Sequence, residues 1–278
     1  MMQLFNKVST RCSRITAHQY STSFSLGIQC FHKRLRDPIY AIYGFVRFAD
    51  EIVDTFHEFN KKVLLDRFRL NTFQAIEERI SLNPILHSFQ YAVNRYGIEK
   101  ELIEKFFNSM EMDLHKTNYS IDELKEYIAG SAEGVGLMCL HVFSEGDKSL
   151  YEKLSPFARS LGAAFQKVNF LRDLNADFNG LGRIYFPGVK ISQWDTGTKF
   201  KIEKSIEVDF NNALEGIKQL PRSSRLGVYV AYVYYRSLFK KIKNISPELV
   251  LKERIRIATT GKARLLAYSY VKHQLNLI

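Results

Sequence analysis

The sequence predicts an all-α fold. The chain of 278 residues contains only six prolines and fifteen glycines, and runs of alternating apolar and polar residues are scarce, so a sheet-rich sandwich or barrel is not expected. Hydrophobic residues make up 46% of the chain and aromatic residues 13%, which is enough for one large core. No composition shift, internal repeat or low-complexity tract marks a boundary, so residues 1–278 are expected to form a single domain.

The first helix is expected to begin at Asp37-Pro38, because an acidic N-cap precedes a proline at the first helical position, and to run past Asp54. Further helical periodicity predicts eight segments: 61–81, 84–94, 99–113, 121–143, 148–178, 202–219, 224–243 and 247–275. Short turn signals separate most of them. The long irregular segment at 179–199 is expected to be a flap over a functional site, because loops of this length are uncommon in compact domains.

Composition also limits the compartment and the partner. Cys12, Cys30 and Cys139 are widely spaced and form no CxxC pair, so neither a disulfide framework nor a zinc site is indicated, and a reducing cytosol fits. The first residues lack the apolar core of a signal peptide, and no stretch approaches the ~18 apolar residues that span a bilayer. We therefore expect a protein of the cytoplasm or of a membrane surface. The net charge of +11 favours nucleic acid, anionic lipid or a phosphorylated substrate.

Two aspartates lie four residues apart in the otherwise apolar helix at 37–54. At about 100° per residue, one face of this helix carries four polar side chains: Tyr43, Arg47, Asp50 and Asp54. Apolar residues occupy the other faces, so the helix is expected to be buried nearly all round. Its charged stripe must then face a cavity.

The segment 148–178 repeats this arrangement beside Arg172. Four polar side chains share one of its faces: Gln166, Asn169, Asp173 and Asp177. Buried carboxylates are tolerated when they are paired or bound to metal, and Mg²⁺ prefers oxygen ligands and commonly bridges carboxylates to substrate phosphates. The alternative is a set of solvated surface ion pairs. Two acid pairs, each beside an arginine, favour a metal–phosphate site that Arg47 and Arg172 contact directly.

Three ordered segments resemble motifs of the squalene/phytoene synthase family of head-to-head prenyl synthases. Residues 20–28 (YSTSFSLGI) are similar to its N-terminal substrate segment, 40–54 (YAIYGFVRFADEIVD) to its first aspartate-rich motif, and 166–187 to its second motif with the following GRIYFP block. The likeness covers nearly the whole chain and is closest to bacterial phytoene synthases. It implies an isoprenoid synthase fold, a single helical bundle in which both acid helices face each other across a central cavity.

The resemblance also implies roles for individual residues. The metal-ligand positions are matched by Asp50, Asp54, Asn169, Asp173 and Asp177. The four aspartates, Arg47 and Arg172 are the expected catalytic residues. Positions that hold substrate diphosphate or chain are matched by Tyr20, Ser21, Thr22, Ser23, Tyr43, Arg47, Gln166, Arg172, Tyr235 and Arg254. Ala129 stands where family members often carry a cavity tyrosine, two residues after Tyr127, so the second half-reaction is the step in question.

The implied enzyme is a phytoene synthase of carotenoid biosynthesis that uses two or three Mg²⁺ ions. It would join two geranylgeranyl diphosphates head to head through a cyclopropylcarbinyl (prephytoene) diphosphate and release diphosphate. A dehydrosqualene or squalene synthase acting on farnesyl diphosphate is the alternative within the family. The GxG within 130–136 lies in a helical context and indicates close helix packing, so no nicotinamide cofactor is expected.

Candidates for an aromatic cavity wall that offsets carbocation charge are Phe24, Phe45, Phe165, Phe170, Tyr232 and Tyr235. For any one of these side chains, ordinary core packing is the commoner role.

Other classes of protein fit less well. A non-catalytic lipid-binding or assembly protein on the same scaffold would be expected to lose ligands from the acid motifs, and all of them are present. No nucleic-acid module is recognised, so nucleic acid is not an expected partner. The two DxxxD motifs and the GRIYFP block argue against a terpene cyclase or head-to-tail synthase. The basic surface is expected to contact anionic membrane, which would deliver lipophilic substrate and receive an apolar product.

Overall fold

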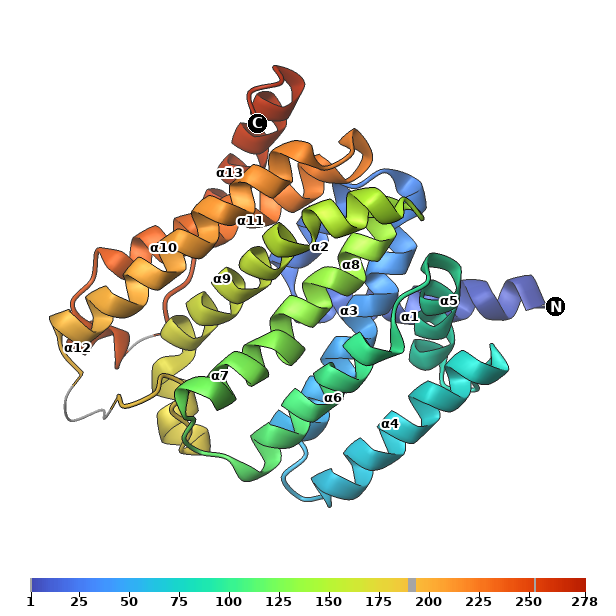
Figure 1. The fold of residues 1–278 in the computed structure, drawn as a ribbon, viewed down its shortest axis with the longest axis horizontal. Coiled ribbons are helices and arrows are strands. Elements are labelled where there is room, and N and C mark those ends of the chain that lie inside the picture. The colour runs from blue at the N-terminus through green and yellow to red at the C-terminus, as the bar shows by residue number, and fades with distance from the viewer. Residues whose placement is uncertain (1, 190–193, 253) are drawn as a thin grey trace.

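The structure is a computed structural model that describes residues 2–189, 194–252 and 254–278, and its regular elements are helices (Figure 1). In chain order they are α1 (Met2–Tyr20), α2 (Thr22–Gln29), α3 (Lys33–Asp54), α4 (Lys61–Glu78), α5 (Pro84–Tyr96), α6 (Lys100–His115), α7 (Ile121–Ile128), the π-helical turn η1 (Ala129–Glu133), α8 (Gly134–Ser144), α9 (Lys148–Leu181), α10 (Thr196–Gln219), α11 (Arg222–Lys243), α12 (Pro247–Val250) and α13 (Thr259–Gln274). An isolated β-bridge joins Asn118 to Ile184. The predicted all-α class is confirmed.

The two acid-bearing helices lie at the centre of the bundle. The 34-residue α9 runs between α10 and α8 (Figure 1), and α3 packs against α1, α5 and α8. As predicted, α3 is buried on most of its circumference, and its Phe45 stacks on Phe89 with ring centroids 3.9 Å apart. The apolar packing of both helices leaves their polar stripes as the sides that meet across the interior.

Two helices precede the first one that the sequence predicted. The helical pattern of α1 was missed because the residues that it buries are Ser9, Ser13 and Ala17, which carry no hydrophobic signal. The boundaries of the next helix were also wrong. Helix α3 begins at Lys33 instead of Asp37, since fully buried Leu35 draws its first turn into the core, and it ends at Asp54 instead of running past it.

The predicted helix at 247–275 is broken into α12 and α13. Residues 251–258 lack regular structure in their described part, and the Leu251 carbonyl accepts a hydrogen bond from the Asn175 side chain on α9. The helical periodicity is therefore overridden by contacts of this segment with the central helix.

The irregular segment predicted at 179–199 is shorter than expected. Helix α9 continues to Leu181 and ends at Gly182, which has a positive φ of 66° that glycine adopts without strain. Helix α10 begins at Thr196, where the Asp195 side chain accepts a hydrogen bond from the Thr198 backbone N at 2.7 Å. Residues 190–193 of this predicted flap lie outside the described residues.

The predicted helix at 121–143 is continuous but changes its winding at η1. Gly130 lies so close to α6 that a Cβ there would stand 2.2 Å from the Lys105 carbonyl oxygen. The close packing predicted for the glycine-rich run is confirmed.

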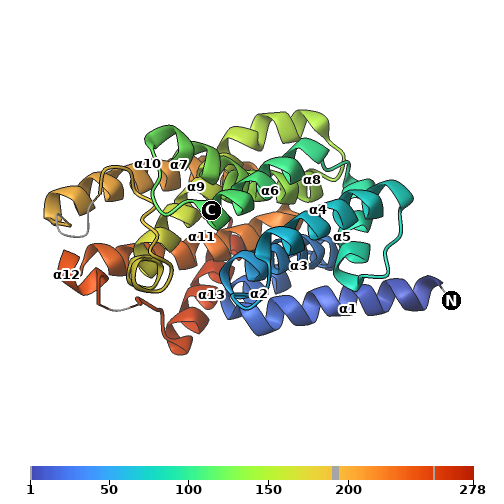
Figure 2. The same ribbon diagram turned by 90° about the horizontal axis from the view of Figure 1, so that it is seen from below.

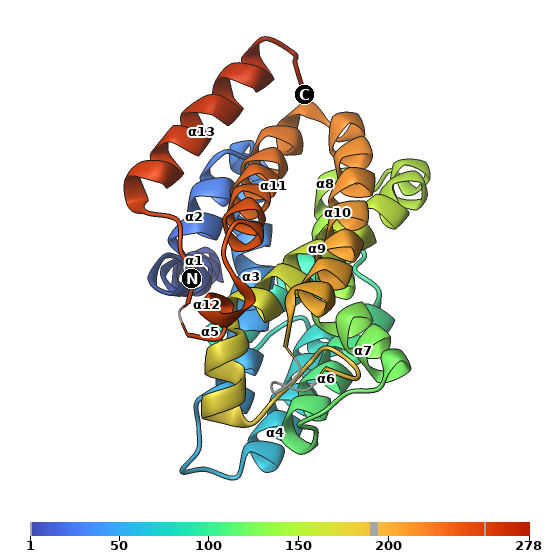
Figure 3. The same ribbon diagram turned by 90° about the vertical axis from the view of Figure 1, so that its left-hand side faces the viewer.

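Helices α1 and α13 lie on one face of the bundle and α7 and α8 on the opposite face, as the two turned views agree (Figures 2 and 3). Among the described residues, no helix is both long and apolar enough to cross a bilayer.

Candidate active site

Both acid clusters line the same polar cavity of about 460 Å³. Asp50 and Asp54 come from the last turns of α3, and Asn169, Asp173 and Asp177 come from α9. The cavity is also lined by every other residue that the resemblance assigned, with the exception of Thr22. Thr22 instead accepts a hydrogen bond from the Lys262 ammonium at 2.6 Å.

The acids of the two helices influence each other electrostatically. Burial, followed by the charge of Asp54, raises the pKa of Asp50 to about 7 against the opposing effect of Arg47. Burial, followed by the charges of Asp173 and Asp54, raises the pKa of Asp177 to about 7. Asp54 on α3 thus acts on an acid of α9, and the cavity holds more negative charge than its own arginines neutralise.

This donor set fits magnesium brought in with a phosphate. In the described part of the chain, no group of three His, Cys, Asp or Glu side chains lies close enough together to hold a metal ion by itself. Mg²⁺ commonly binds one or two carboxylates and completes its octahedron with waters and substrate phosphates. Hard carboxylate oxygens that repel one another across the cavity suit that mode.

Arginines from both acid-bearing helices lie beside the acids. Arg47 is paired with both Asp50 and Glu51, and its guanidinium lies 4.4 Å from the centroid of the Tyr20 ring. Arg172 Nε donates to Asp173 Oδ1 at 3.0 Å. These cations keep the cavity from being uniformly acidic and present donors to an incoming anion.

Asp173 joins the C-terminal segment to the site as well. Arg254 Nε lies 2.7 Å from Asp173 Oδ1, so the break between α12 and α13 brings a third arginine to the cavity. Arg254 was expected from the resemblance to bind diphosphate, and its position beside Asp173 is compatible with that role.

The residues that shape the cavity floor are held by hydrogen bonds. Ser21 caps α2 by accepting from the Phe24 backbone N at 3.2 Å, and Tyr235 donates to Asn169 Oδ1 at 3.2 Å. Burial raises the pKa of Tyr43 to about 12, which keeps its phenol neutral. The candidate metal ligand Asn169 is therefore oriented by a phenol from α11.

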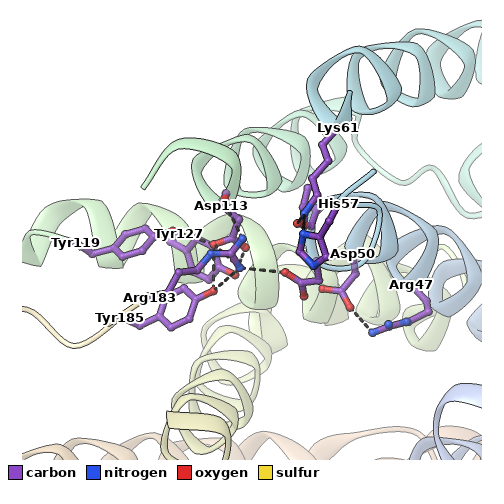
Figure 4. Close-up of polar contacts among 11 residues, drawn as sticks. Arg47, Asp50, His57, Lys61, Asp113, Tyr119, Tyr127, Arg183 and Tyr185 are labelled. Carbon is purple, nitrogen blue, oxygen red and sulfur yellow. Dashed lines mark hydrogen bonds and ion pairs between the residues drawn. The ribbon is translucent and has the colours of Figure 1, made fainter. Parts of the chain in front are cut away.

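A buried hub next to the acids was missed by the sequence analysis (Figure 4). Asp113, only 7% exposed, accepts hydrogen bonds from three phenols: Tyr119 at 2.9 Å, Tyr127 at 2.8 Å and Tyr185 at 3.1 Å. Burial raises the pKa of Asp113, although Arg183 opposes this effect. The sequence does contain a pattern that could have identified Asp113. Phe106, Met110 and Asp113 recur at helical spacing on one face of α6, and all three line the cavity.

Arg183 connects this hub to the first acid motif. Its guanidinium donates to Asp54 Oδ1 at 3.0 Å and to the Asp113 carbonyl oxygen at 2.7 Å. These hydrogen bonds hold the GRIYFP block, which contains Arg183 and Tyr185, against the C-terminal end of α3. The part of the predicted flap at 183–185 does contribute side chains to the site.

Tyr127 and Ala129 occupy different surroundings. The Tyr127 phenol donates a hydrogen bond to Asp113. Ala129 is the first residue of η1 and does not line the polar cavity. Ser131, in the same π-helical turn, lines the cavity, and its buried hydroxyl has no hydrogen-bond partner in the described part of the chain.

An apolar cavity of about 310 Å³ adjoins the polar one. The side chains that line both are Phe24, Tyr43, Val46, Ser131, Gln166, Asn169 and Tyr235. Among the predicted aromatic wall residues, Phe165 stacks on Tyr235 with centroids 3.9 Å apart and also lines the apolar cavity. Phe170 lines the polar cavity, whereas Phe45 and Tyr232 are core residues that line neither.

Comparisons with known proteins agree with this architecture. The family model described as squalene/phytoene synthase matches residues 17–195. The chain is 28% identical over 256 residues to phytoene synthase 1 of Zea mays, covering 84% of this chain and 61% of that protein. It is 27% identical over 262 residues to phytoene synthase 1 of Arabidopsis thaliana, covering 87% and 61%. The chain thus spans about three fifths of the length of these plant relatives.

Solved structures show the same fold. A dehydrosqualene synthase in complex with a ligand superposes with a TM-score of 0.82 at 20% identity, covering 97% of this chain and 98% of that one. A squalene synthase from Alicyclobacillus acidocaldarius superposes with a TM-score of 0.75 at 18% identity, covering 86% and 94%. The predicted isoprenoid synthase fold is confirmed. With a family model matched over more than half of its residues, and with both aspartate-rich motifs on one cavity, the chain belongs to the squalene/phytoene synthase family.

Proposed function

We propose that the protein is a magnesium-dependent phytoene synthase that condenses two geranylgeranyl diphosphates head to head. The observation that carries this proposal is the convergence of acids and arginines from α3 and α9 on a polar cavity that adjoins an aromatic-walled apolar one. The polar cavity suits diphosphate groups, and the apolar cavity suits prenyl chains. The sequence relatives named above are phytoene synthases, which favours the C20 substrate over farnesyl diphosphate.

Magnesium would be held by Asp50, Asp54, Asn169, Asp173 and Asp177, and it would neutralise the charge that develops on a departing diphosphate. Arg47, Arg172 and Arg254 donate hydrogen bonds to the same diphosphate as the C–O bond breaks. The electron pair leaves with the diphosphate, and an allylic cation remains beside Phe165 and Tyr235.

The double bond of the second substrate then attacks C1 of this cation, and loss of a proton closes a cyclopropylcarbinyl diphosphate. That intermediate ionises in its turn, rearranges and loses another proton to give the hydrocarbon. The ring faces of Phe24, Phe165 and Tyr235 stabilise positive charge and exclude water during both ionisations. Released diphosphate accepts the protons, because no side chain stands out as a dedicated base.

The test is incubation of purified protein with geranylgeranyl diphosphate or farnesyl diphosphate and Mg²⁺, followed by mass analysis of the products. A C40 hydrocarbon from the C20 substrate supports the proposal, and a C30 product from farnesyl diphosphate alone would assign the enzyme to the squalene type. Asp173→Ala is expected to abolish turnover while retaining the helical circular dichroism spectrum. Products from neither substrate would favour a non-catalytic lipid-binding protein, although all five candidate ligands are in place.

A further inference from the structure

Helix α1 is amphipathic in the reverse sense to an ordinary surface helix. The fully buried residues on the face that it packs against the bundle are small, Ser9, Ser13 and Ala17, and near the start of the helix the ring of Phe5 packs against His87 of α5. Ser13 Oγ lies 2.6 Å from Ser88 Oγ on α5. Large apolar side chains on the opposite face are 67%, 46% and 60% exposed: Leu4, Val8 and Ile15. Burying the small side and exposing the large one forgoes hydrophobic stabilisation unless something covers the outer face.

Helix α13 also exposes large apolar side chains. Ser269 is its one buried residue among those described, and Leu265 packs in part against the core. Three other apolar side chains are 50%, 55% and 63% exposed: Tyr268, which also contacts Tyr229 of α11, Val271, and Leu275 at the end of the helix. Spacings of three and four residues place them in one stripe with Arg264. Two helices from distant parts of the sequence thus each expose a stripe of large apolar side chains.

The excess of positive over negative charge comes from the segments that contain these two helices. Residues 1–36 contain six Lys or Arg and no acid, and residues 254–278 contain five and no acid. The other 29 Lys and Arg equal in number the 29 acids of the chain, all of which lie between positions 37 and 253. The whole formal charge of +11 therefore comes from the segments that contain α1 and α13.

Both helices lie on the same side of the molecule, with α2 between them (Figures 2 and 3). Lys262 of α13 donates to Thr22 of α2 at 2.6 Å, which links the segments directly. Arg14 is paired with Asp37 at 2.7 Å, but Lys7, Arg11 and Arg264 form no ion pair with any acid in the described part of the chain.

We propose that the outer sides of α1 and α13 form a docking face for an anionic lipid bilayer. The docking face comprises Leu4, Lys7, Val8, Arg11, Ile15, Arg264, Tyr268, Val271 and Leu275. Apolar stripes flanked by cations are the pattern by which interfacial helices insert at the boundary between headgroups and acyl chains. Cations near an anionic membrane add attraction that falls with salt.

Charge complementarity selects this occupant over a second copy of the chain. Pairing two docking faces would bring two acid-free, positively charged segments together, which is unfavourable. A nucleic acid would meet the charge but would leave the stripes of Leu, Val and Ile without an apolar partner.

The two segments that carry the docking face also reach the polar cavity. Tyr20, at the end of α1, is 49% exposed, and the Arg254 side chain, at the start of the second acid-free segment, is 50% exposed. Both residues line the polar cavity. A bilayer bound to the docking face would therefore border the route by which a lipophilic molecule enters or leaves. This inference goes beyond the proposed reaction and does not depend on it.

The test is co-sedimentation of the protein with phosphatidylcholine vesicles that contain either no anionic lipid or roughly 30% phosphatidylserine. The wild type is expected to bind the anionic vesicles and to dissociate as salt is raised. Replacing the unpaired cations (Lys7→Gln, Arg11→Gln, Arg264→Gln) is expected to lower the partition coefficient about a hundredfold. Replacing the apolar stripe (Leu4→Ser, Val8→Ser, Val271→Ser, Leu275→Ser) is expected to lower it at least about tenfold.

Matched controls use exposed residues on other helices. One control removes the same charge elsewhere, in the triple variant Arg67→Gln, Lys153→Gln, Lys204→Gln. The other removes exposed apolar side chains, in the double variant Leu70→Ser, Ile121→Ser. Both controls are expected to bind vesicles like the wild type. Equal losses in these controls, or wild-type binding indifferent to phosphatidylserine, would overturn the proposal. So would light scattering that shows a dimer which the stripe variant converts to a monomer. The vesicles contain no substrate or metal, so a failure here is separate from a failure of the condensation assay.

Discussion

At the scale of single residues, the fold disfavours the ionised form of two acids of the cavity, Asp50 and Asp177. Asp177 has a pKa near 7 because burial and the charges of Asp173 and Asp54 disfavour its carboxylate. Below its ordinary pKa near 3.8, the acid is protonated whether the chain is folded or not. As the pH rises to about 7, the unfolded chain releases this proton and the folded chain retains it, so the acid lowers the free energy of unfolding.

This linkage predicts the behaviour of Asp177→Asn in metal-free protein. The free energy of unfolding of the variant minus that of the wild type is the quantity of interest. This difference is expected to be larger at about pH 8 than at about pH 5, by on the order of 1 kcal/mol. Urea unfolding in the presence of a chelator measures both differences. The same difference at the two pH values would show that Asp177 is not destabilised by its neighbours.

Asp113 is the residue whose charge organises the most partners. It accepts three phenolic hydrogen bonds and lies 3.8 Å from Arg183. Asp113→Asn is expected to lower the free energy of unfolding by about 3 kcal/mol, because it removes the charge that the three buried phenols share and one of the carboxylates that balance the buried guanidinium of Arg183. Tyr119→Phe removes one hydrogen bond and is expected to cost about 1 kcal/mol. Denaturant unfolding compares them, and a smaller loss for Asp113→Asn would contradict the hub.

At the scale of elements, η1 depends on a glycine that allows it to touch α6. A Cβ on Gly130 would lie 2.2 Å from the Lys105 carbonyl oxygen and 2.9 Å from Ser109 Oγ. Gly130→Ala is therefore expected to lower the free energy of unfolding by about 2 kcal/mol, since backbone must move to relieve the overlap.

Gly180 in α9 provides the control for this prediction, because a Cβ there would meet nothing within 4 Å. Gly180→Ala is expected to be stabilising by about 0.5 kcal/mol through the helix propensity of alanine. Thermal unfolding of both variants distinguishes a steric role of Gly130 from a general effect of replacing glycine. If both variants shift the melting temperature equally, the contact with α6 is not what requires glycine at 130.

Element boundaries differ from their predictions where tertiary contacts outweigh local pattern. Helices α9 and α11, whose apolar residues recur with helical spacing, were predicted with ends close to those observed. Helix α1 was missed because its buried face is made of serine and alanine. The segment 247–275 was predicted as one helix, but its middle is drawn to α9 by Asn175 and Asp173.

At the scale of the whole molecule, the candidate metal–diphosphate site exists only where α3 and α9 meet. Neither helix alone supplies both acid clusters, so Mg²⁺ and diphosphate are expected to bind together more tightly than either binds alone. Mg²⁺ with inorganic pyrophosphate is expected to raise the melting temperature by about 5 °C at a hundredfold excess over the dissociation constant.

Differential scanning calorimetry with each ligand alone and with both measures this coupling. Asp173→Ala is expected to lose the joint effect and to retain its melting temperature without ligands to within a few degrees. Shifts that simply add, or a joint shift that survives in Asp173→Ala, would contradict a shared site.

The sequence by itself determined the all-α class, the two acid stripes and the family, because helical periodicity and the order of motifs are local properties of the chain. The finer likeness to bacterial phytoene synthases stays a prediction. Only the tertiary structure decided that the stripes share a cavity and that Thr22 lies outside it. It also assembled the hub of Asp113, Arg183 and the tyrosines. Residues 54, 113 and 183 are far apart in the sequence, and no local pattern encodes a contact that arises only when separate helices pack.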